Sequence, residues 1–223
     1  MRKRLLLFVA LCSLTGTTAV HAQFPLIDYQ GFAWETGGFP ASNPGDFLNL
    51  VAIVDDLDAV FGIDLGVDEV TVYATGLVST GEIPLGGGFL AINYVGGTLD
   101  VYQDPSMDAA FGINPANATV PSTFTNGGLF LGAVVTSFFL FYDTTNGVGS
   151  YEGNITFTAG SGLASVQGIE ADGYTFGGTL NSIASSGNIP EGYDLQIDGA
   201  IEVRVSIAVE EKTWGGVKDL YRR

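Results

Sequence analysis

Apolar and polar residues alternate over many segments of this chain, and a period of two residues predicts β-strands. Segment 150–159 has apolar or small residues at its odd positions and polar residues at its even ones. Segments 69–75, 194–198 and 201–209 alternate in the same way. No segment from 23 to 209 carries a sustained helical pattern, so we expect a protein built of strands.

Two glycines at 96–97 separate two strand-like segments, 89–95 and 98–102. Glycine reaches positive φ values without steric cost, and a two-residue hairpin loop needs such values. The pattern therefore predicts a β-hairpin with its turn at 96–97.

The longest apolar run covers 129–142 and is too short and too interrupted for a membrane span. We expect one long central strand there, or two strands with a bend near Thr136 and Ser137. At 55–62 the sequence has room for one helical turn.

Clusters of glycine, proline, asparagine and serine separate the strand-like runs, and such clusters mark turns. Strands at short spacing with glycine-rich turns are typical of a sandwich or a barrel. We expect one all-β domain over 23–209, an antiparallel β-sandwich of jelly-roll-like form. The clusters lie at 40–45, 81–88, 114–128, 160–162 and 185–192.

The first residues have the features of a secretory signal peptide. Basic residues at 2–4 precede an apolar stretch at 5–14, and small or apolar residues stand before Gln23. We expect cleavage after residue 22, and hence a secreted protein or one displayed at the cell surface. The apolar stretch is shorter than the roughly 20 residues that cross a bilayer, so we expect no integral membrane span.

The distribution of charge excludes several classes of function. From Gln23 to Val203 the chain has no lysine, arginine or histidine, and its only cysteine, Cys12, lies in the predicted signal peptide. Nucleic acids and phosphate groups are held mainly by Lys and Arg, so we expect no nucleic-acid partner. Without histidine or cysteine the mature chain has no Ser-His-Asp triad and no zinc site of the Cys/His type.

Acidic side chains make a bound calcium ion the sharpest chemical hypothesis, because calcium binds carboxylate and carbonyl oxygens. Six acidic residues crowd into segment 55–69. Asp100, Asp104 and Asp108 form a second, thinner cluster. The alternative is that these acids are solvated surface charges. The candidate calcium ligands are Asp55, Asp56, Asp58, Asp64, Asp68 and Glu69.

The acidic segment 194–199, farther along the chain, resembles the start of a calcium-binding EF-hand loop. Gln196 stands where an acid or amide is usual, and Val205 stands where the bidentate glutamate should be. The alternation at 194–198 favours a strand over a calcium loop.

Two sugar-directed functions remain open. A glycoside hydrolase needs only two carboxylates, and Glu35 beside Trp34, together with Glu152 or Glu170, are formal candidates. No motif frames them, so we expect no enzyme. A glycan-binding module would instead use an aromatic surface, whereas the simpler interpretation places the same aromatic side chains in the core. Those side chains are Tyr29, Phe32, Trp34, Phe39, Tyr94 and Tyr102.

The last segment, 210–223, differs from the acidic body. Lys212 to Arg223 carries four basic residues and one acid, and Trp214 and Val217 lie at the spacing of one helical face. We expect a basic amphipathic tail that sorting machinery or an envelope protein recognises. The residues that would carry this recognition are Trp214, Lys218, Tyr221 and Arg222.

The chain combines a signal peptide, a Gly/Asp/Phe-rich body, a closing strand at 192–199 and a tail ending in Arg222-Arg223. This layout resembles that of secreted bacterial β-sandwich proteins with a short C-terminal sorting tail. The PEP-CTERM group is the best known of these. The chain lacks that group's Val-Pro-Glu-Pro motif and its transmembrane stretch. The resemblance implies export and surface display, and it implies no activity.

We therefore expect a secreted or surface-displayed structural or binding protein without catalysis, stabilised by calcium. A module that binds surface glycans is the alternative.

Overall fold

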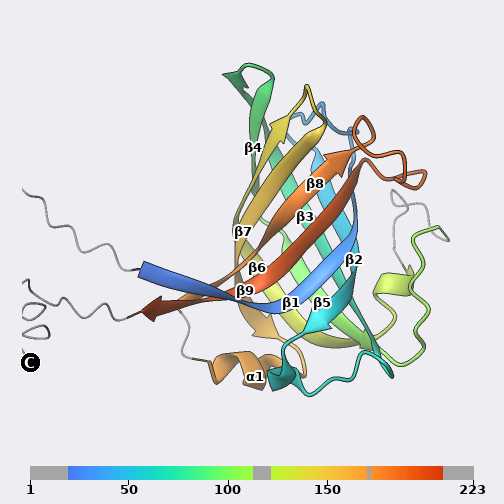
Figure 1. Ribbon diagram of the computed structural model, residues 1–223, viewed down its shortest axis with the longest axis vertical. Helices are drawn as coiled ribbons and strands as arrows, with labels where there is room; N and C mark the ends of the chain where they lie inside the picture. The colour runs from blue at the N-terminus through green and yellow to red at the C-terminus, as the bar shows by residue number, and fades with distance from the viewer. Residues whose placement is uncertain (1–19, 113–121, 170–171, 208–223) are drawn as a thin grey trace, which may run out of the picture. The chain divides into compact units, whose positions relative to one another are not determined.

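The computed structural model describes residues 20–112, 122–169 and 172–207 (Figure 1). Residues 22–205 form one compact unit, and the account below concerns that unit. The predicted signal peptide lies almost wholly outside the described residues, and the predicted tail at 210–223 lies outside them entirely. The first strand begins at Val20, three residues before the predicted cleavage point.

Nine strands make up most of the described chain. They are β1 (Val20–Glu35), β2 (Phe47–Leu57), β3 (Glu69–Gly86), β4 (Phe89–Val95), β5 (Thr98–Asp104), β6 (Gly128–Asp143), β7 (Val148–Ala159), β8 (Gly173–Ser182) and β9 (Leu195–Ile207). The helical elements are short: η1 (Ala59–Phe61), η2 (Ser122–Phe124) and α1 (Leu163–Gln167). The prediction of a helical turn within 55–62 is confirmed by η1.

All nine strands belong to one sheet, in the order β2-β1-β9-β8-β7-β6-β4-β3-β5. Additional pairings of β2 with β3 and of β6 with β5 close this sheet on itself (Figure 1). The ladders described residue by residue are antiparallel. The prediction of an all-β, antiparallel, sandwich-like fold is confirmed. The two packed faces are opposite walls of the same sheet.

The predicted hairpin at 96–97 is wrong. β4 and β5 both run antiparallel to β3 and both run antiparallel to β6, so they continue each other in one direction. Val95 pairs with Val78 and Thr98 pairs with Thr75, which is one uninterrupted register. The two glycines use their positive φ values for an irregularity within a long strand, and the chain does not reverse there.

The long apolar run forms a single strand, β6, as predicted. The alternative of two strands is not realised: near residue 136 the register against β7 shifts between Val135 and Ser137, and the strand continues through this irregularity. β6 pairs with β5 and β4 on one side and with β7 on the other. Its inward side chains, such as Phe138 and Leu140, are buried, whereas Phe139 and Phe141 are exposed.

Side chains from all parts of the sheet fill its interior. Leu50, Val72, Leu99, Leu131 and Ile201 are among the fully buried ones. The space that Leu50, Phe138 and Ile197 line has a volume of about 10 Å³, which is no more than a single water molecule needs. At that place the interior is therefore filled by side chains.

Aromatic side chains close the two ends of the interior. At one end Phe61 of η1 packs edge-on against Phe130 of β6, with ring centres 5.4 Å apart. At the other end Phe39, from the loop between β1 and β2, packs against Tyr142 at 4.8 Å.

A second, smaller apolar group lies on the outer face of β1, β2 and β3; we call it the outer aromatic cluster. Loop residues Phe111 and Tyr193 cover Phe32 and Trp34 of β1, and Phe124 of η2 packs against Phe111. The connections 105–112 and 183–194 are therefore packed onto the sheet.

Among the described residues no helix has both the length and the apolar character that crossing a membrane requires.

Candidate functional sites

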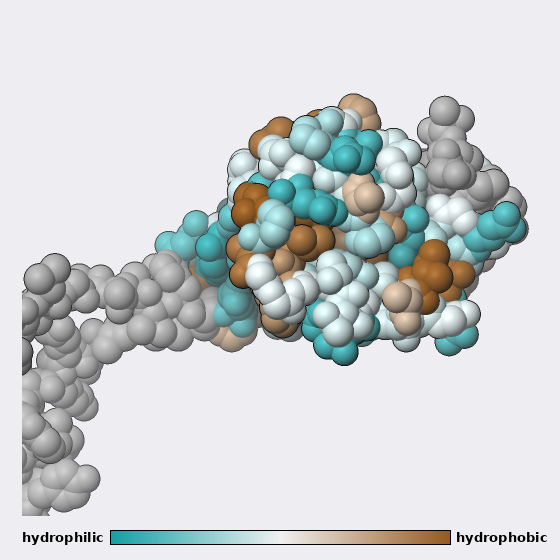
Figure 2. Space-filling view, turned by 90° about the horizontal axis from the view of Figure 1, so that it is seen from above, coloured by the Kyte–Doolittle hydropathy of each residue, from teal (hydrophilic) through white to brown (hydrophobic). Residues whose placement is uncertain are grey.

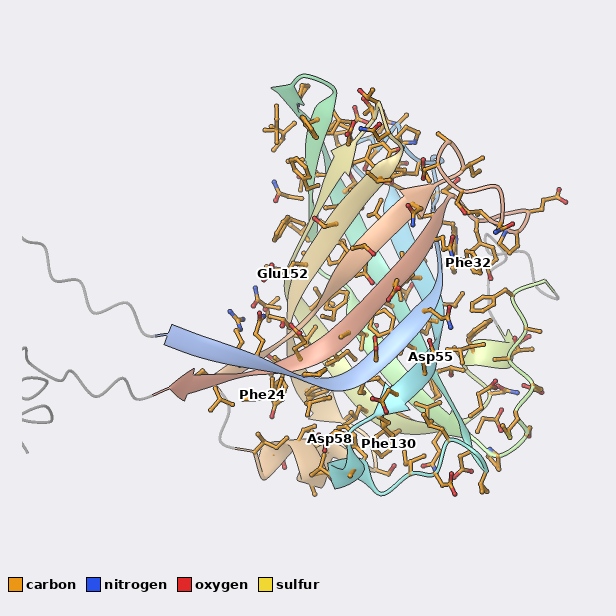
Figure 3. All side chains as sticks on the ribbon, viewed as in Figure 1. Phe24, Phe32, Asp55, Asp58, Phe130 and Glu152 are labelled. Carbon is orange, nitrogen blue, oxygen red and sulfur yellow. The ribbon has the colours of Figure 1, made fainter. Side chains whose placement is uncertain are left out.

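The structure spreads the predicted calcium ligands of segment 55–69 along an exposed edge. Asp55 and Asp56 lie at the end of β2, and Asp55 and Asp58 are labelled in Figure 3. Asp58 caps η1 by accepting a hydrogen bond of 2.8 Å from the amide of Val60. Asp64 likewise accepts one of 2.9 Å from the amide of Gly66. Asp58 and Asp64 thus act as a local cap and a turn, which is the ordinary role of this side chain in loops. Asp68 accepts a hydrogen bond of 2.8 Å from the side-chain amide of Gln103 on β5.

Only one of those six residues joins a convergent group. Glu69, Asp104 and Asp108 each offer a carboxylate oxygen within 4.8 Å of the others, and no other such group occurs among residues 20–112, 122–169 and 172–207. We call these three residues the acidic triad. It combines the last member of the first predicted cluster with two members of the second.

Strand pairing brings the acidic triad together. Glu69 is the first residue of β3, Asp104 is the last residue of β5, and the two stand directly opposite each other. The chain then turns through Met107, whose φ of 50° lies in the left-handed region. This turn returns Asp108 to Glu69, whose carboxylate accepts a hydrogen bond of 2.9 Å from the amide of Ala109.

Backbone and amide groups hold the other two carboxylates. Asp104 Oδ1 accepts a hydrogen bond of 2.8 Å from the amide of Ser106. Asp108 Oδ1 accepts one of 3.0 Å from the side-chain amide of Asn126, just before β6. Three stretches of chain that are distant in sequence therefore meet at the acidic triad.

The surroundings of Glu69 disfavour its negative charge. Burial raises the pKa of Glu69, and repulsion by the charges of Asp104 and Asp108 adds to that rise, while hydrogen bonds from the amides of Ala109 and Asp108 oppose it. Asp104 is 5 % exposed, and its Oδ2 is buried without a hydrogen-bond partner. A buried acceptor without a partner is rare in native structures and calls for an explanation.

A different buried carboxylate, Glu35, lies at the end of the interior closed by Phe39. It is 4 % exposed and accepts hydrogen bonds from the hydroxyls of Ser42, at 2.6 Å, and Tyr94, at 3.4 Å. Ser42 also lies 2.7 Å from the hydroxyl of Ser79. Burial raises the pKa of Glu35 to about 7, with the hydrogen bonds opposing it and nearby aspartates adding to it.

The arrangement of Trp34 and Glu35 does not favour a sugar-cleaving site. Successive side chains of a strand point to opposite faces of the sheet. Trp34 belongs to the outer aromatic cluster, whereas Glu35 points inward to Ser42 and Tyr94. Glu152 stands exposed on β7 (Figure 3), which β8 and β9 separate from β1, and Glu170 lies outside the described residues. The structure thus does not bring these candidates together around one sugar bond.

An open hollow with a volume of about 620 Å³ lies beside the same end of β1. Trp34, Glu35, Tyr193 and Asp194 line it together with glycines. Asp194 accepts a hydrogen bond of 2.9 Å from the amide of Glu35, and burial raises its pKa. The aromatic residues Trp34 and Tyr193 and the acidic residue Asp194 thus line one open depression.

The aromatic side chains proposed for glycan binding are mostly internal. Tyr29, Trp34 and Tyr94 are buried, and Phe32, Phe39 and Tyr102 are half-buried. The exposed apolar side chains are different ones, which the sequence analysis did not single out: Ile83, Leu85, Phe89, Phe139 and Phe141 on β3, β4 and β6. On the face in Figure 2, apolar side chains form several separate groups among polar ones.

The segment 194–198, compared above with an EF-hand, is a strand from Leu195 onward, as the alternation favoured. The tail residues Trp214, Lys218, Tyr221 and Arg222 lie outside the described residues, so their role stays a prediction.

No protein-family model matches the chain, and no curated protein or solved structure matches it either. The residues themselves carry the functional argument.

Proposed function

We propose that this protein is exported and acts outside the cytoplasm as a structural or binding protein without catalysis. The observation that carries this proposal is the side-chain packing inside the closed sheet, where the space between Leu50, Phe138 and Ile197 has a volume of only about 10 Å³. Many closed sheets of this size enclose a small ligand, and a filled one leaves only the outer surface and the termini for function.

The charge distribution supports the same proposal. An acidic body without lysine, arginine or histidine from 23 to 203 repels nucleic acids and anionic lipids, so neutral or cationic partners suit it best. The basic tail at 210–223 is the natural element for sorting or for docking to an envelope protein.

Cell fractionation tests the role of the tail. We expect the full chain to reach the surface or the medium, and a chain lacking 210–223 to be exported but mislocalised. A matched variant with Trp214→Ala and Arg222→Ala should behave like the deletion if those side chains are recognised. The sorting role would be refuted by an unchanged location of both variants.

Glycan binding is a second candidate, favoured by the hollow that Trp34, Tyr193 and Asp194 line. A glycan array tests it, with Trp34→Ala as one variant. Because Trp34 is buried, Ile183→Glu is the better-matched variant: Ile183 is 63 % exposed and lines the same hollow, so its replacement leaves the core intact. Silence of the native chain on the array removes this candidate.

The absence of catalysis is tested with a panel of polysaccharides. Hydrolysis of any of them that a Glu35→Gln, Glu152→Gln double variant abolishes would overturn the non-catalytic proposal.

A further inference from the structure

The acidic triad has no internal counter-charge. Arg204 is the only lysine or arginine among residues 22–205, and its guanidinium donates to Asn154 on β7. Three carboxylates this close repel one another, and a bound cation would relieve that repulsion.

The position of Asp104 favours a cation. Its Oδ1 is already used by the amide of Ser106, whereas Oδ2 is buried and has no hydrogen-bond partner. Buried charged oxygens in proteins are normally paired or coordinate a metal.

The carboxylates are also held in place in advance. Glu69 is fixed by the amide of Ala109, Asp104 by the amide of Ser106, and Asp108 by the side chain of Asn126. Oxygens that share one calcium ion at 2.3–2.6 Å lie at most about 5 Å from each other, and the three candidate oxygens meet this limit.

We propose that Glu69, Asp104 and Asp108 bind one calcium ion on the outer face of the sheet, where β3 begins and β5 ends. The donor set consists of oxygen atoms only, which suits a hard cation. Calcium accepts irregular sets of carboxylate ligands, whereas magnesium demands near-ideal octahedral geometry. The bound ion would join β3, β5 and the loop at 105–109. This inference does not depend on the proposed function, since the site belongs to the fold whatever the outer surface binds.

The test uses the full chain, purified after export, with its thermal unfolding measured in EDTA, in millimolar calcium and in millimolar magnesium. Isothermal titration with CaCl₂ gives the stoichiometry. We expect one calcium ion per chain and an unfolding midpoint that rises by several degrees in calcium and much less in magnesium.

The decisive variant is Asp104→Asn, because the proposal predicts opposite signs in two conditions. In EDTA the variant should unfold at a higher temperature than the native chain, since it relieves repulsion. In calcium it should unfold at a lower temperature and bind the ion about tenfold more weakly or worse, since affinity follows the charge of the ligands. Asp55→Asn is the matched control: it removes an exposed aspartate of the neighbouring segment and should leave calcium binding unchanged.

Two outcomes would overturn the proposal. One is no heat of binding up to 10 mM calcium, a concentration of about ten times the weakest dissociation constants of extracellular calcium modules. The other is an Asp104→Asn variant that is more stable than the native chain both in EDTA and in calcium, which would mean that the acidic triad is neutralised by protons.

Discussion

The hydroxyl of Ser42 donates a hydrogen bond of 2.6 Å to the buried carboxylate of Glu35, seven residues earlier in the chain. This bond joins the end of β1 to the loop that covers one end of the interior. Because Tyr94 of β4 also donates to Glu35, the carboxylate connects the loop to the opposite wall of the sheet.

The first prediction concerns pH. The pKa of Glu35 is raised from its ordinary value of 4.5 to about 7 in the folded protein. Its stabilising contribution is therefore fully present below pH 4.5 and is lost as the pH rises through 7. Replacing Glu35 with glutamine should remove this loss, so the variant should gain about 1–2 kcal/mol relative to the native chain between pH 4.5 and 7.5.

Urea unfolding at several pH values measures this difference. Glu152→Gln serves as the control because Glu152 is exposed, and its unfolding should follow the pH dependence of the native chain. Parallel curves for the native chain and Glu35→Gln would show that Glu35 does not titrate in this range.

The second prediction concerns the glycine pair that joins β4 to β5. A Cβ on Gly97 would stand 2.8 Å from Leu77 and 3.0 Å from the carbonyl oxygen of Thr75, at a φ of 96°. Gly97→Ala should therefore destabilise the protein by about 1–3 kcal/mol. Gly187→Ala, where a Cβ meets no atom within 4 Å, should change the free energy of unfolding by less than about 0.5 kcal/mol. Equal effects of the two variants would argue against the continuous strand.

The third prediction uses two neighbours on β6 that point in opposite directions. Phe138 is 3 % exposed and stacks on Phe176 at 5.2 Å, whereas Phe139 is 43 % exposed. Phe138→Ala should cost about 3–5 kcal/mol of stability, and Phe139→Ser should cost close to nothing. Chemical denaturation of both variants checks the register of β6, because a slip by one residue would reverse the two results.

The fourth prediction concerns a pair of hydroxyls inside the sheet. Tyr151 donates a hydrogen bond of 3.1 Å to the hydroxyl of Tyr29, and both side chains are buried. Each single change to phenylalanine should cost about 1–2 kcal/mol, because it leaves the remaining hydroxyl without its partner. The double change should cost less than the sum of the two, and a double-mutant cycle by urea unfolding measures the difference. Strict additivity would mean that the two hydroxyls do not interact.

Much of the fold was predictable because strand alternation is a local property. β7 and the start of β3 followed directly from it, and β6 followed from its length and apolar character. β8 went unnoticed, since Gly177 and Gly178 interrupt its pattern. β3 continues to Gly86 through a segment that composition assigned to a loop, because Glu82 and Ile83 still pair with β4.

The error at 96–97 has a physical cause. Positive φ at two successive glycines suits both a tight turn and an irregular point within a strand, and the local sequence does not distinguish them. The pairing with β3 and β6 determines which of the two forms, because each of these long strands pairs with both β4 and β5 along one edge.

The acidic triad was half visible in the sequence. Both acidic clusters were recognised, yet Glu69 was grouped with its neighbours in sequence and not with its partner across the ladder, Asp104. Register between strands depends on the whole sheet, so the composition of one segment does not supply it. Glu69 begins β3 and Asp104 ends β5, its antiparallel partner. An acid at the start of one strand and another at the end of its partner are the signal that would have joined the two clusters.

The adjacency of β1 and β9 in the closed sheet has a consequence for the order of folding. Every other pairing joins strands that are close in sequence, whereas this seam joins the first strand to the last. Until β9 is available, β1 and β8 each keep one edge with unpaired backbone groups, and such edges attract other chains. When the chain emerges from a ribosome or an export channel with its first strand leading, the edges of β1 and β8 therefore stay unpaired until nearly the whole chain has emerged. Edge-to-edge association with other chains is blocked only once β9 pairs with both.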